Sequence, residues 1–329
     1  MRVGIIGCGL IGHKRAAAAG DHTLAMCADP VAARAETLAA EHPGCVATSD
    51  PARVISCANV DAVIVATTHD ALTKWTLTAM EAGKHVLVEK PAARTAVELQ
   101  PVVAAARARG TVVKVGFNHR FHPALQQARS LFASGAVGDL LYIRGRYGHG
   151  GRPGYEKEWR ADPRISGGGE LLDQGSHLID LARWFAGDFA EATGHLTSYY
   201  WSMPVEDNAF VSLKTASGQL AWLHASWTEW KNLFSFEIVG RSGKLQVDGL
   251  GGSYGTERLT LYHMLPEMGP PETTSWEFPG ADLSWHSEFD HFVDCIENGS
   301  TPCGSIADAL ANLEIVDCLY REAGRDHRA

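Results

Sequence analysis

The stretch "RVGIIGCGLIG", residues 2–12, decides the fold. An apolar run typical of a buried strand leads into Gly7, Gly9 and Gly12, which are spaced as G-x-G-x-x-G, and a helical segment follows. A strand before the glycines and a helix after them is the context that a dinucleotide-binding turn requires. Gly7 permits the tight turn, Gly9 lets the backbone approach a pyrophosphate, and Gly12 lets helix and strand pack closely. The alternative is a glycine-rich turn without a ligand.

A regular alternation of strand and helix continues through residues 1–118. Apolar, β-branched runs alternate with alanine-rich helical segments, which predicts a doubly wound parallel sheet. The expected strands are 2–7, 24–29, 61–67, 85–90 and 112–117, and the expected helices are 10–19, 31–41, 70–82 and 95–109.

The pattern changes after about residue 135. Long segments alternate apolar and polar residues, and short turns such as "ASGQ" and "RSGK" link several of them, which predicts hairpins in a largely antiparallel sheet with one face covered. The expected strands are 140–149, 208–218, 220–229, 234–240, 244–249 and 258–265, with helices at 169–186, 286–298 and 305–323.

This change of pattern predicts an α/β protein of two domains. Residues 1–120 are expected to form a dinucleotide-binding Rossmann domain with a doubly wound parallel sheet. Residues 121–329 are expected to form an α+β domain for substrate binding and oligomerisation, built on a large, mostly antiparallel sheet. In this arrangement the terminal helices can pack back on the first domain.

Composition narrows the class of protein. The 329 residues are 45% hydrophobic and carry a net charge of −9, which argues against a nucleic-acid partner. No stretch reaches the roughly 18–20 apolar residues of a membrane span, and glycines interrupt the apolar start, unlike a signal peptide. Seven scattered cysteines, with no Cys-x-x-Cys pair, fit reduced thiols in the cytoplasm.

Asp29 indicates which dinucleotide is bound. It ends the expected second strand, about twenty residues after the glycines, where a carboxylate hydrogen-bonds the adenosine ribose 2′-hydroxyl and repels a 2′-phosphate. We therefore expect NAD rather than NADP. A helix N-cap before Pro30 is the structural alternative, and it is compatible with the same role.

A resemblance becomes plain when the glycine turn is taken together with three other motifs. These are "EAGKHVLVEKP" at 81–91, "GFNHRFHP" at 116–123 and "GGGELLDQGSHLIDLARW" at 167–184. In this order and spacing they resemble the Gfo/Idh/MocA family, which includes glucose–fructose oxidoreductase and inositol 2-dehydrogenase. The resemblance implies NAD(P)-dependent oxidation or reduction of a sugar or cyclitol hydroxyl.

The resemblance also implies site residues. Lys90 matches the E-K-P lysine, which contacts substrate and nicotinamide, and Asp173 and His177 match the substrate-binding and catalytic pair. Independent chemistry agrees, because an imidazole accepts a hydroxyl proton near neutral pH and an ammonium stabilises the developing alkoxide. We therefore expect His177 to be the base, Lys90 to polarise the oxygen and Asp173 to orient the substrate.

Two other acidic residues share the expected helical stripe with this pair. Glu170, Asp173, His177 and Asp180 lie at i, i+3, i+7 and i+10. We expect Glu170 and Asp180 to have structural roles. Metal binding by Glu170, Asp173 and His177 is the alternative, but no second histidine lies at i±4, so no metal is expected.

The stretch after the expected fourth strand departs from the family pattern. Many members have T-P-N there and a histidine at position 72, where this chain has Thr68, His69 and Leu72. Strand ends should still touch the cofactor. The expected cofactor-binding residues are Gly7, Gly9, Leu10, Ile11, Gly12, Asp29, Thr67, Thr68, His69, Glu89, Lys90 and Asn118.

The loop-like segment 146–169 is the main candidate for substrate recognition, since loops on a rigid scaffold often carry it. Its basic residues suggest an anionic sugar such as a nucleotide sugar or sugar phosphate, although Glu156, Glu158 and Asp162 offset much of that charge. An ordinary surface lid is the alternative. The expected substrate-binding residues are Lys90, Arg120, His149, Arg152, Tyr155, Trp159, Asp173 and His177.

The leading functional hypothesis is an NAD-dependent sugar or cyclitol dehydrogenase. An NAD-dependent glycosidase without net redox change and a non-catalytic dinucleotide-binding sensor are the alternatives. The alternating strands carry Trp222, Trp227, Trp230, Phe234 and Phe236, so one sheet face is expected to bury against another subunit in a homodimer or homotetramer.

Overall fold

The structure is a computed structural model that describes residues 1–108 and 110–324. It divides into two compact units. The first unit comprises Met1–Phe117 and Trp285–Leu313, and the second comprises Asn118–Ser284 together with the chain from Glu314. Each unit is described by itself.

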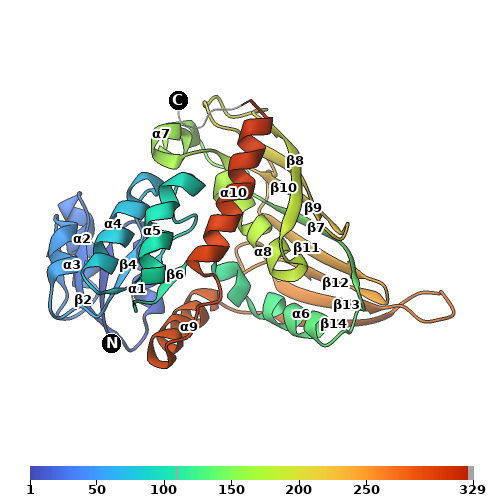
Figure 1. Ribbon diagram of the computed structural model, residues 1–329, viewed down its shortest axis with the longest axis horizontal. Helices are drawn as coiled ribbons and strands as arrows, with labels where there is room; N and C mark the ends of the chain where they lie inside the picture. Colours follow the sequence, from blue (N-terminus) through green and yellow to red (C-terminus); the bar gives the residue numbers. More distant parts are fainter. Residues whose placement is uncertain (109, 325–329) are drawn as a thin grey trace. The chain divides into compact units, whose positions relative to one another are not determined.

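The first unit contains a parallel sheet in the order β3-β2-β1-β4-β5-β6, which confirms the predicted Rossmann fold (Figure 1). Sequence reasoning missed its short third strand. The strands are β1 (Arg2–Ile6), β2 (Thr23–Ala28), β3 (Val46–Thr48), β4 (Ala62–Val65), β5 (His85–Val88) and β6 (Val113–Val115). The helices are α1 (Leu10–Ala18), α2 (Ala32–Ala40), α3 (Pro51–Ser56), α4 (His69–Glu81) and α5 (Ala96–Ala108).

The core of the first unit draws on both ends of the sequence. The central strands are buried on both faces and contribute Val3, Ile5 and Ile64. Phe289 and Phe292, on α9 (Ser284–Asn298), lie in the same apolar cluster. The amphipathic helix α9 therefore belongs to the core of this unit, although nearly two hundred residues separate it from β5.

The second unit contains an eight-stranded sheet in the order β14-β13-β12-β11-β7-β10-β9-β8. Its only parallel pair among the described strands joins β10 to β7, so the predicted, mostly antiparallel sheet is confirmed. Both outermost strands, β8 and β14, were missed. The strands are β7 (Leu140–Gly148), β8 (Phe189–Thr197), β9 (Asn208–Thr215), β10 (Leu220–Ser226), β11 (Leu233–Gly240), β12 (Gly243–Asp248), β13 (Glu257–His263) and β14 (Glu272–Phe278).

Helices cover one face of this sheet. α6 (Pro123–Ala133) packs on β12 to β14, and α8 (Ser176–Ala186) packs on β7 and β10 (Figure 1). The remaining helical segments are η1 (Asn118–Phe121), η2 (Tyr155–Lys157), η3 (Trp159–Ala161), α7 (Pro163–Ser166) and α10 (Ile306–Glu322). Trp227, Phe234 and Phe236 are buried, whereas Trp222 and Trp230 are 65% and 64% exposed, so three of these five aromatic residues belong to the core and two lie at the surface of the chain.

The predicted single α-helix over 169–186 is wrong in its first part. Leu171–Gly175 forms the π-helical segment η4, and the α-helix α8 begins only at Ser176. A π-turn is wider than an α-turn, so it changes the phase of the predicted stripe between Glu170 and His177. Such turns occur frequently at functional sites.

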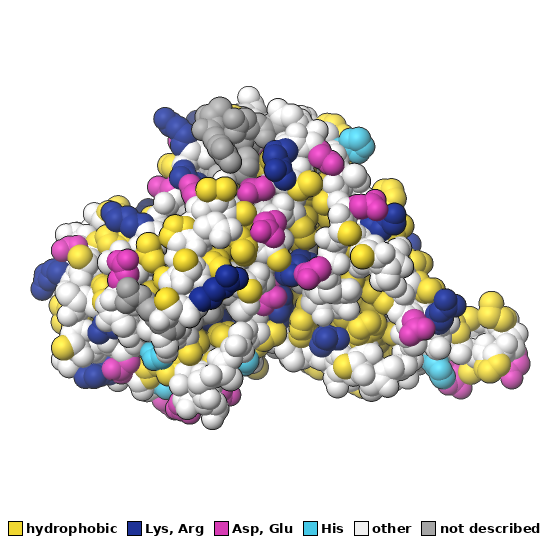
Figure 2. Space-filling model, in the orientation of Figure 1, with side chains coloured by type: hydrophobic (Ala, Val, Ile, Leu, Met, Phe, Trp, Pro, Cys, Tyr) yellow, Lys and Arg dark blue, Asp and Glu magenta, His cyan; other side chains and the backbone are white. Residues whose placement is uncertain are grey.

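No helix within the described residues combines the length and apolar content that crossing a bilayer requires. On the face that Figure 2 shows, Lys and Arg side chains are scattered among Asp and Glu rather than gathered over one element.

Candidate active site

The glycine turn after β1 has the geometry that its spacing predicts. Gly7 has a φ of +97°, a conformation that L-residues rarely adopt. A Cβ at Gly12 would lie 2.1 Å from the backbone oxygen of Gly7, so a side chain there would collide with the turn. At Gly9, by contrast, no atom of the described residues lies within 4 Å of the position a Cβ would take. Gly9 is also the N-cap of α1, so its open side adjoins the amides of Leu10 and Ile11.

This turn lies where the strand order reverses. A Cβ at Gly7 would lie 2.4 Å from the oxygen of Ala66, so the loops after β1 and β4 touch. In open α/β sheets, ligands bind at the carboxyl ends of the strands beside such a reversal. The open Gly9 edge and the N-terminus of α1 therefore fit the pyrophosphate of a dinucleotide.

Asp29 follows β2 and faces the glycine turn. Its carboxylate accepts the N–H groups of Cys8 and Val31, both at 2.9 Å. A carboxylate has about four acceptor positions, so these two bonds orient it and leave capacity for a ribose hydroxyl. This position fits the predicted role in NAD binding.

The predicted residues after β4 also lie at a strand end. Thr68 is the N-cap of α4, and its hydroxyl donates to Asp70 at 2.6 Å. Thr67 is half-buried, and its hydroxyl donates to the carbonyl of Thr68. His69 is the first residue of α4 and is buried. The histidine that many family members have at position 72 is replaced by a fully buried Leu72.

Glu89 and Lys90 follow β5 at the same edge of the sheet. Glu89 is buried and accepts from Arg15 Nε at 2.6 Å, and burial raises the pKa of its carboxyl. Lys90 is half-buried and lies in a turn in which the Ala92 N–H donates to the Glu89 carbonyl at 3.0 Å. Glu89 is therefore part of an internal ion pair. Lys90, the next residue of the motif, lies in the turn that follows the strand.

In the second unit, three glycines introduce η4 and α8. A Cβ at Gly168 would lie 2.1 Å from the Tyr320 hydroxyl, and one at Gly169 would lie 2.1 Å from the Glu206 oxygen. Glu206 Oε1 in turn accepts the N–H groups of Gly169 and Leu171, each at 3.1 Å. The glycines therefore allow Glu206 and Tyr320 to approach the backbone at the start of η4 and hold it.

His177 lies in the first turn of α8, inside an aromatic cluster that we call the imidazole–tyrosine cluster: His119, Tyr147, His177 and Tyr254. The rings of His177 and His119 stack with centroids 3.8 Å apart and planes at 22°. Tyr147 packs edge-on against both imidazoles and lies 5.1 Å from the Tyr254 ring. Burial raises the pKa of the Tyr147 hydroxyl, which therefore stays protonated. These rings hold His177, which is 5% exposed, in one orientation.

Asp173 lies in η4, four residues before His177. Its Oδ2 accepts from Arg160 Nε at 3.0 Å, and the Arg160 guanidinium lies 4.6 Å from the Trp159 ring centroid. The π-helical turn thus carries a carboxylate that forms an ion pair with Arg160, a residue of the segment proposed to recognise substrate. Arg160 lies in that segment, but sequence reasoning did not select it as a site residue.

The other residues of the predicted recognition segment have different surroundings. Tyr155 is buried in an apolar cluster with Val205 and Trp227, so it contributes mainly packing. His149 accepts from the Gly151 N–H at 2.9 Å, and burial lowers the pKa of its imidazole. Arg152 is largely exposed and lies 2.6 Å from Glu158. The charge of Arg152, like that of Arg160, is therefore paired with a nearby carboxylate.

Arg120 and Asn118 belong to η1. Arg120 makes a two-point ion pair with Asp180 on α8, at 2.8 and 2.7 Å, and both side chains are buried. Asn118 donates to Ser284 at 2.9 Å, and its Oδ1 lies 3.3 Å from His119 Nδ1. Both residues thus hold η1, and with it His119, in place.

Sequence reasoning missed His119, Tyr147, Glu206, Tyr254 and Tyr320 as site or support residues. His119 belongs to the motif at 116–123 but was not selected as a site residue, and the others carried no motif. Their partners are distant in sequence, so only tertiary contacts identify them. In the described part of the chain, no group of three or more His, Cys, Asp or Glu side chains is arranged to bind a metal.

Known proteins resemble this chain over nearly its whole length. A solved structure of levoglucosan dehydrogenase in complex with NADH is similar with a TM-score of 0.88 and 25% sequence identity, covering 98% of this chain and 97% of the other. The scyllo-inositol 2-dehydrogenase (NAD(+)) of Bacillus subtilis is 26% identical, covering 96% of this chain and 92% of the relative. The 1,5-anhydro-D-fructose reductase of Ensifer adhaerens is 30% identical, covering 77% and 76%.

Two family models match the two parts of the sequence. Residues 1–117 match the oxidoreductase family with an NAD-binding Rossmann fold, and residues 125–246 match the C-terminal domain of the same family. The glycine turn, the Asp29 carboxylate and the strand ends fit the NAD that this model specifies. The chain therefore belongs to the Gfo/Idh/MocA family of oxidoreductases, and its Rossmann domain binds NAD.

Proposed function

We propose that this protein is a dehydrogenase that transfers a hydride between NAD and a secondary hydroxyl or ketone of a sugar, a sugar derivative or a cyclitol. The observation that carries the proposal is that His177 and Asp173 lie on consecutive turns, each held by neighbouring side chains. One is held by stacked rings and the other by Arg160. The printed names of the relatives, which act on sugars and an inositol, support the same class of substrate.

In the proposed reaction, His177 accepts the proton of the reacting hydroxyl. Bound NAD would supply the acceptor for the hydride that leaves the carbinol carbon. Lys90 donates a hydrogen bond to the same oxygen and stabilises the negative charge that develops on it. Asp173 orients the substrate and stabilises the charged imidazole of His177. Gly7, Gly9, Gly12 and Asp29 hold the dinucleotide.

We further propose that the substrate is a neutral polyol. Arg152 lies 2.6 Å from Glu158, and Arg160 lies 3.0 Å from Asp173, so the charges of both arginines are offset. Had a phosphate been their partner, at least one guanidinium would be expected to point away from carboxylates. Turnover of nucleotide sugars or sugar phosphates, without turnover of hexoses, anhydrosugars or inositols, would reverse this choice.

Replacing His177 tests the chemical role. His177→Ala should slow NADH formation by roughly 10²–10⁴-fold, because general-base assistance is worth about that much. Binding of NADH, read by its fluorescence, should be unchanged. His195→Ala, on β8, is the matched control and should keep full activity. A fully active His177→Ala enzyme would reject the assignment.

The two alternative functions give different products. A glycosidase releases an aglycone without accumulation of NADH, whereas a dehydrogenase accumulates NADH and a ketone. A sensor binds NADH but turns over no member of a broad sugar panel. Measuring NADH, released aglycone and bound NADH in the same reactions separates all three functions.

We propose that the uncovered face of the eight-stranded sheet pairs with another copy in a homodimer or homotetramer. Trp222 is 65% exposed on this face, and Arg144, Phe210 and Trp222 help line a hollow of about 460 Å³. Light scattering should give a dimer or tetramer, and Trp222→Glu should reduce it to monomers.

The seven cysteines, all unbridged, support the prediction that the protein works in the cytoplasm.

A further inference from the structure

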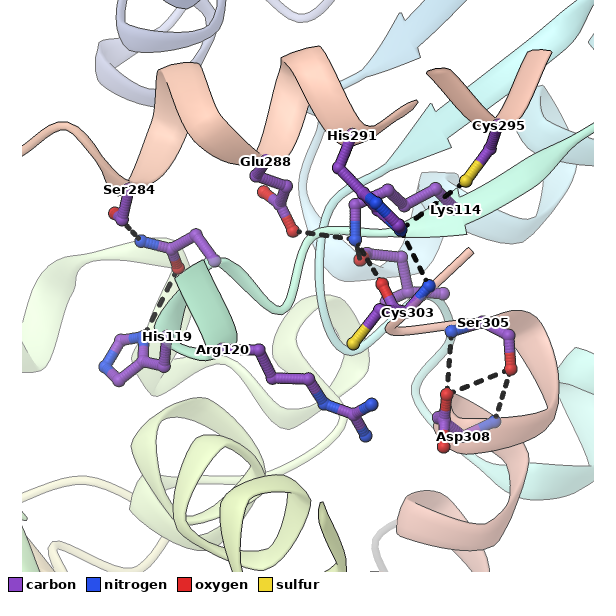
Figure 3. Close-up of polar contacts among 12 residues, drawn as sticks. Lys114, His119, Arg120, Ser284, Glu288, His291, Cys295, Cys303, Ser305 and Asp308 are labelled. Carbon is purple, nitrogen blue, oxygen red and sulfur yellow. Dashed lines mark hydrogen bonds and ion pairs between the residues drawn. The ribbon is translucent and has the colours of Figure 1, made fainter. Parts of the chain in front are cut away.

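Four charged side chains meet in the interior of the first unit. We call Arg15, Glu89, Lys114 and Glu288 the buried charge cluster. Arg15 Nε lies 2.6 Å from Glu89 Oε1, and Arg15 Nη1 lies 2.6 Å from Glu288 Oε2. Lys114 Nζ lies 3.2 Å from Glu288 Oε1 and also donates to the carbonyl of Cys303 at 2.6 Å (Figure 3).

These charges are withdrawn from solvent. Arg15, Lys114 and Glu288 are fully buried, and Glu89 is 8% exposed. Isolated buried charges are very costly, so two cations and two anions must compensate one another. Arg15 contacts both carboxylates, and its guanidinium also lies over the Trp285 ring at 4.4 Å. Arg15 is therefore the connection through which Glu288 restrains Glu89.

The space around Arg15 is closely fitted. A Cβ at Gly116 would lie 2.5 Å from Arg15 Nη2 and 3.2 Å from both carboxylate oxygens of Glu89. Gly116 follows β6, the strand that pairs with β5. The chain therefore has no side chain at the place where Arg15 and Glu89 meet. The packing leaves Arg15 and Glu89 little room for another arrangement.

Glu89 is the residue before Lys90. Its backbone N–H donates to Val65 at 2.9 Å, and its carbonyl accepts the Ala92 N–H at 3.0 Å, closing the turn that carries Lys90. Glu89 is thus held at two places. Contacts with β4 and the turn hold its backbone, and Arg15 holds its carboxylate. Any shift of Arg15 would be transmitted to the start of that turn.

We propose that Arg15 and Glu288 are positioning residues for Lys90: Glu288, on α9, anchors Arg15, and Arg15 fixes the Glu89 residue from which Lys90 projects. This inference rests on the proposed role of Lys90 in the reaction. It extends that role to a helix far away in the sequence. Since Arg15 lies on the helix that begins at the glycine turn, the same contacts link the cofactor-binding helix to the lysine.

The test measures how Lys90 reacts with an acetylating ester, using mass spectrometry of peptides over about pH 7 to 11, where lysine amines titrate. Glu288→Gln should raise the limiting rate at high pH by about threefold or more, because fewer contacts then hold the turn closed. At high pH the amine is uncharged in both proteins, so this limiting rate reports access rather than protonation.

Lys84 is the internal control. It precedes β5, whereas Lys90 follows it, and its ammonium donates to the carbonyls of Cys57 and Val60. Loosening of the whole unit would change the labelling of both lysines. Action through Glu89 changes Lys90 alone, with Lys84 labelling altered by less than about 1.5-fold.

Lys114→Met is the matched variant. It removes the other cation that contacts Glu288 but leaves the contact between Arg15 and Glu89 in place, so Lys90 should label as in the unchanged protein. If Glu288→Gln does not fold, Arg15→Lys replaces it, since a lysine keeps the charge but lacks the fork that reaches both carboxylates. It should raise Lys90 labelling in the same way.

Unchanged Lys90 labelling in Glu288→Gln, or equal changes in Lys84 and Lys90, would overturn the proposal. So would equal effects of Glu288→Gln and Lys114→Met. These outcomes are independent of the proposed function, because labelling needs no substrate. The proposed function fails instead if Lys90→Met retains full NADH formation.

Discussion

Two groups of glycines, one in each unit, support candidate site residues, and they do so for different reasons. Gly7, Gly9 and Gly12 satisfy the local geometry of one turn and leave an open edge for a ligand. Gly168 and Gly169 have no such motif; they are glycine because Tyr320 and Glu206 occupy the space where side chains would be. The first group is a property of the local chain, and the second is a property of the tertiary fold. The comparison predicts that substitutions in the two groups will separate cofactor binding from the integrity of the His177 region.

The largest effect is expected where a Cβ would meet backbone in either group. Gly12→Ala and Gly169→Ala each place a Cβ 2.1 Å from a backbone oxygen, so each should destabilise its unit by about 3 kcal/mol or more. Urea denaturation gives the free energy of unfolding. Gly12→Ala should lose NADH binding, whereas Gly169→Ala should retain it while losing turnover. If both variants lost NADH binding, the two groups of glycines would not have the separate roles proposed for them.

A smaller effect on the free energy of unfolding is expected when Asp207, the residue after Glu206, is replaced. Its buried carboxylate accepts the N–H groups of Tyr199, Tyr200 and Trp201. Burial opposes ionisation, but these hydrogen bonds outweigh it and lower the pKa of the carboxyl. Asp207→Asn should therefore cost about 2 kcal/mol, as expected for a charged hydrogen-bond acceptor.

The pH dependence of this contribution follows from the lowered pKa. The stabilisation is fully present above the carboxyl's unfolded pKa of about 3.9 and is lost as pH falls through the lower folded pKa. The difference in unfolding free energy between Asp207 and Asp207→Asn proteins should thus shrink on acidification. A difference that grows at low pH would contradict the assignment.

Removing one hydroxyl should have a still smaller effect. The Tyr320 hydroxyl donates to Glu206 at 2.6 Å and accepts the Gly169 N–H at 3.1 Å. Tyr320→Phe should lower the free energy of unfolding by about 1–2 kcal/mol and reduce turnover, with NADH binding unchanged. Thermal unfolding and NADH fluorescence give the two quantities. Unchanged stability would mean that Glu206 holds η4 without this tyrosine.

The smallest effect on stability is expected at Gly9. Its φ of −79° suits any residue, and a Cβ there meets no atom of the described chain, so Gly9→Ala should alter unfolding by less than about 0.5 kcal/mol. The same Cβ would face the pyrophosphate, so NADH affinity should fall by about tenfold, the size of a modest steric loss. Undiminished affinity would mean that the dinucleotide does not approach Gly9.

The sequence predicted those features that depend on local pattern. The glycine spacing, the apolar runs and the position of Asp29 were sufficient for the Rossmann sheet, because a parallel strand buried on both faces has a continuous apolar sequence. The alternating segments were sufficient for the central strands of the second sheet. Its outermost strands β8 and β14 were missed because no residue of either strand is buried, so edge strands such as "EATGHLT" and "ETTSWEF" lack a clearly apolar face.

The arrangement around His177 depends on contacts that no local pattern encodes. His119 and His177 are far apart in sequence, and their stacking follows from the ion pair of Arg120 with Asp180. The π-turn at Leu171–Gly175 was predicted as α-helix because a single π-turn is too short to be distinguished in a helical pattern read over several turns, although it shifts the phase of that pattern. The packing of Tyr155 is another example, since its neighbours Val205 and Trp227 are brought by other segments.

The transfer of deuterium from a ring carbon tests the central claim most directly. The protein is incubated with NAD and neutral sugars or inositols deuterated at their carbinol carbons, and the reduced cofactor is analysed by mass spectrometry. The account predicts one deuterium in each reduced cofactor molecule, formed together with a ketone, at a rate that falls by roughly 10²–10⁴-fold in His177→Asn. Reduced cofactor without deuterium, or an undiminished rate in His177→Asn, would contradict it.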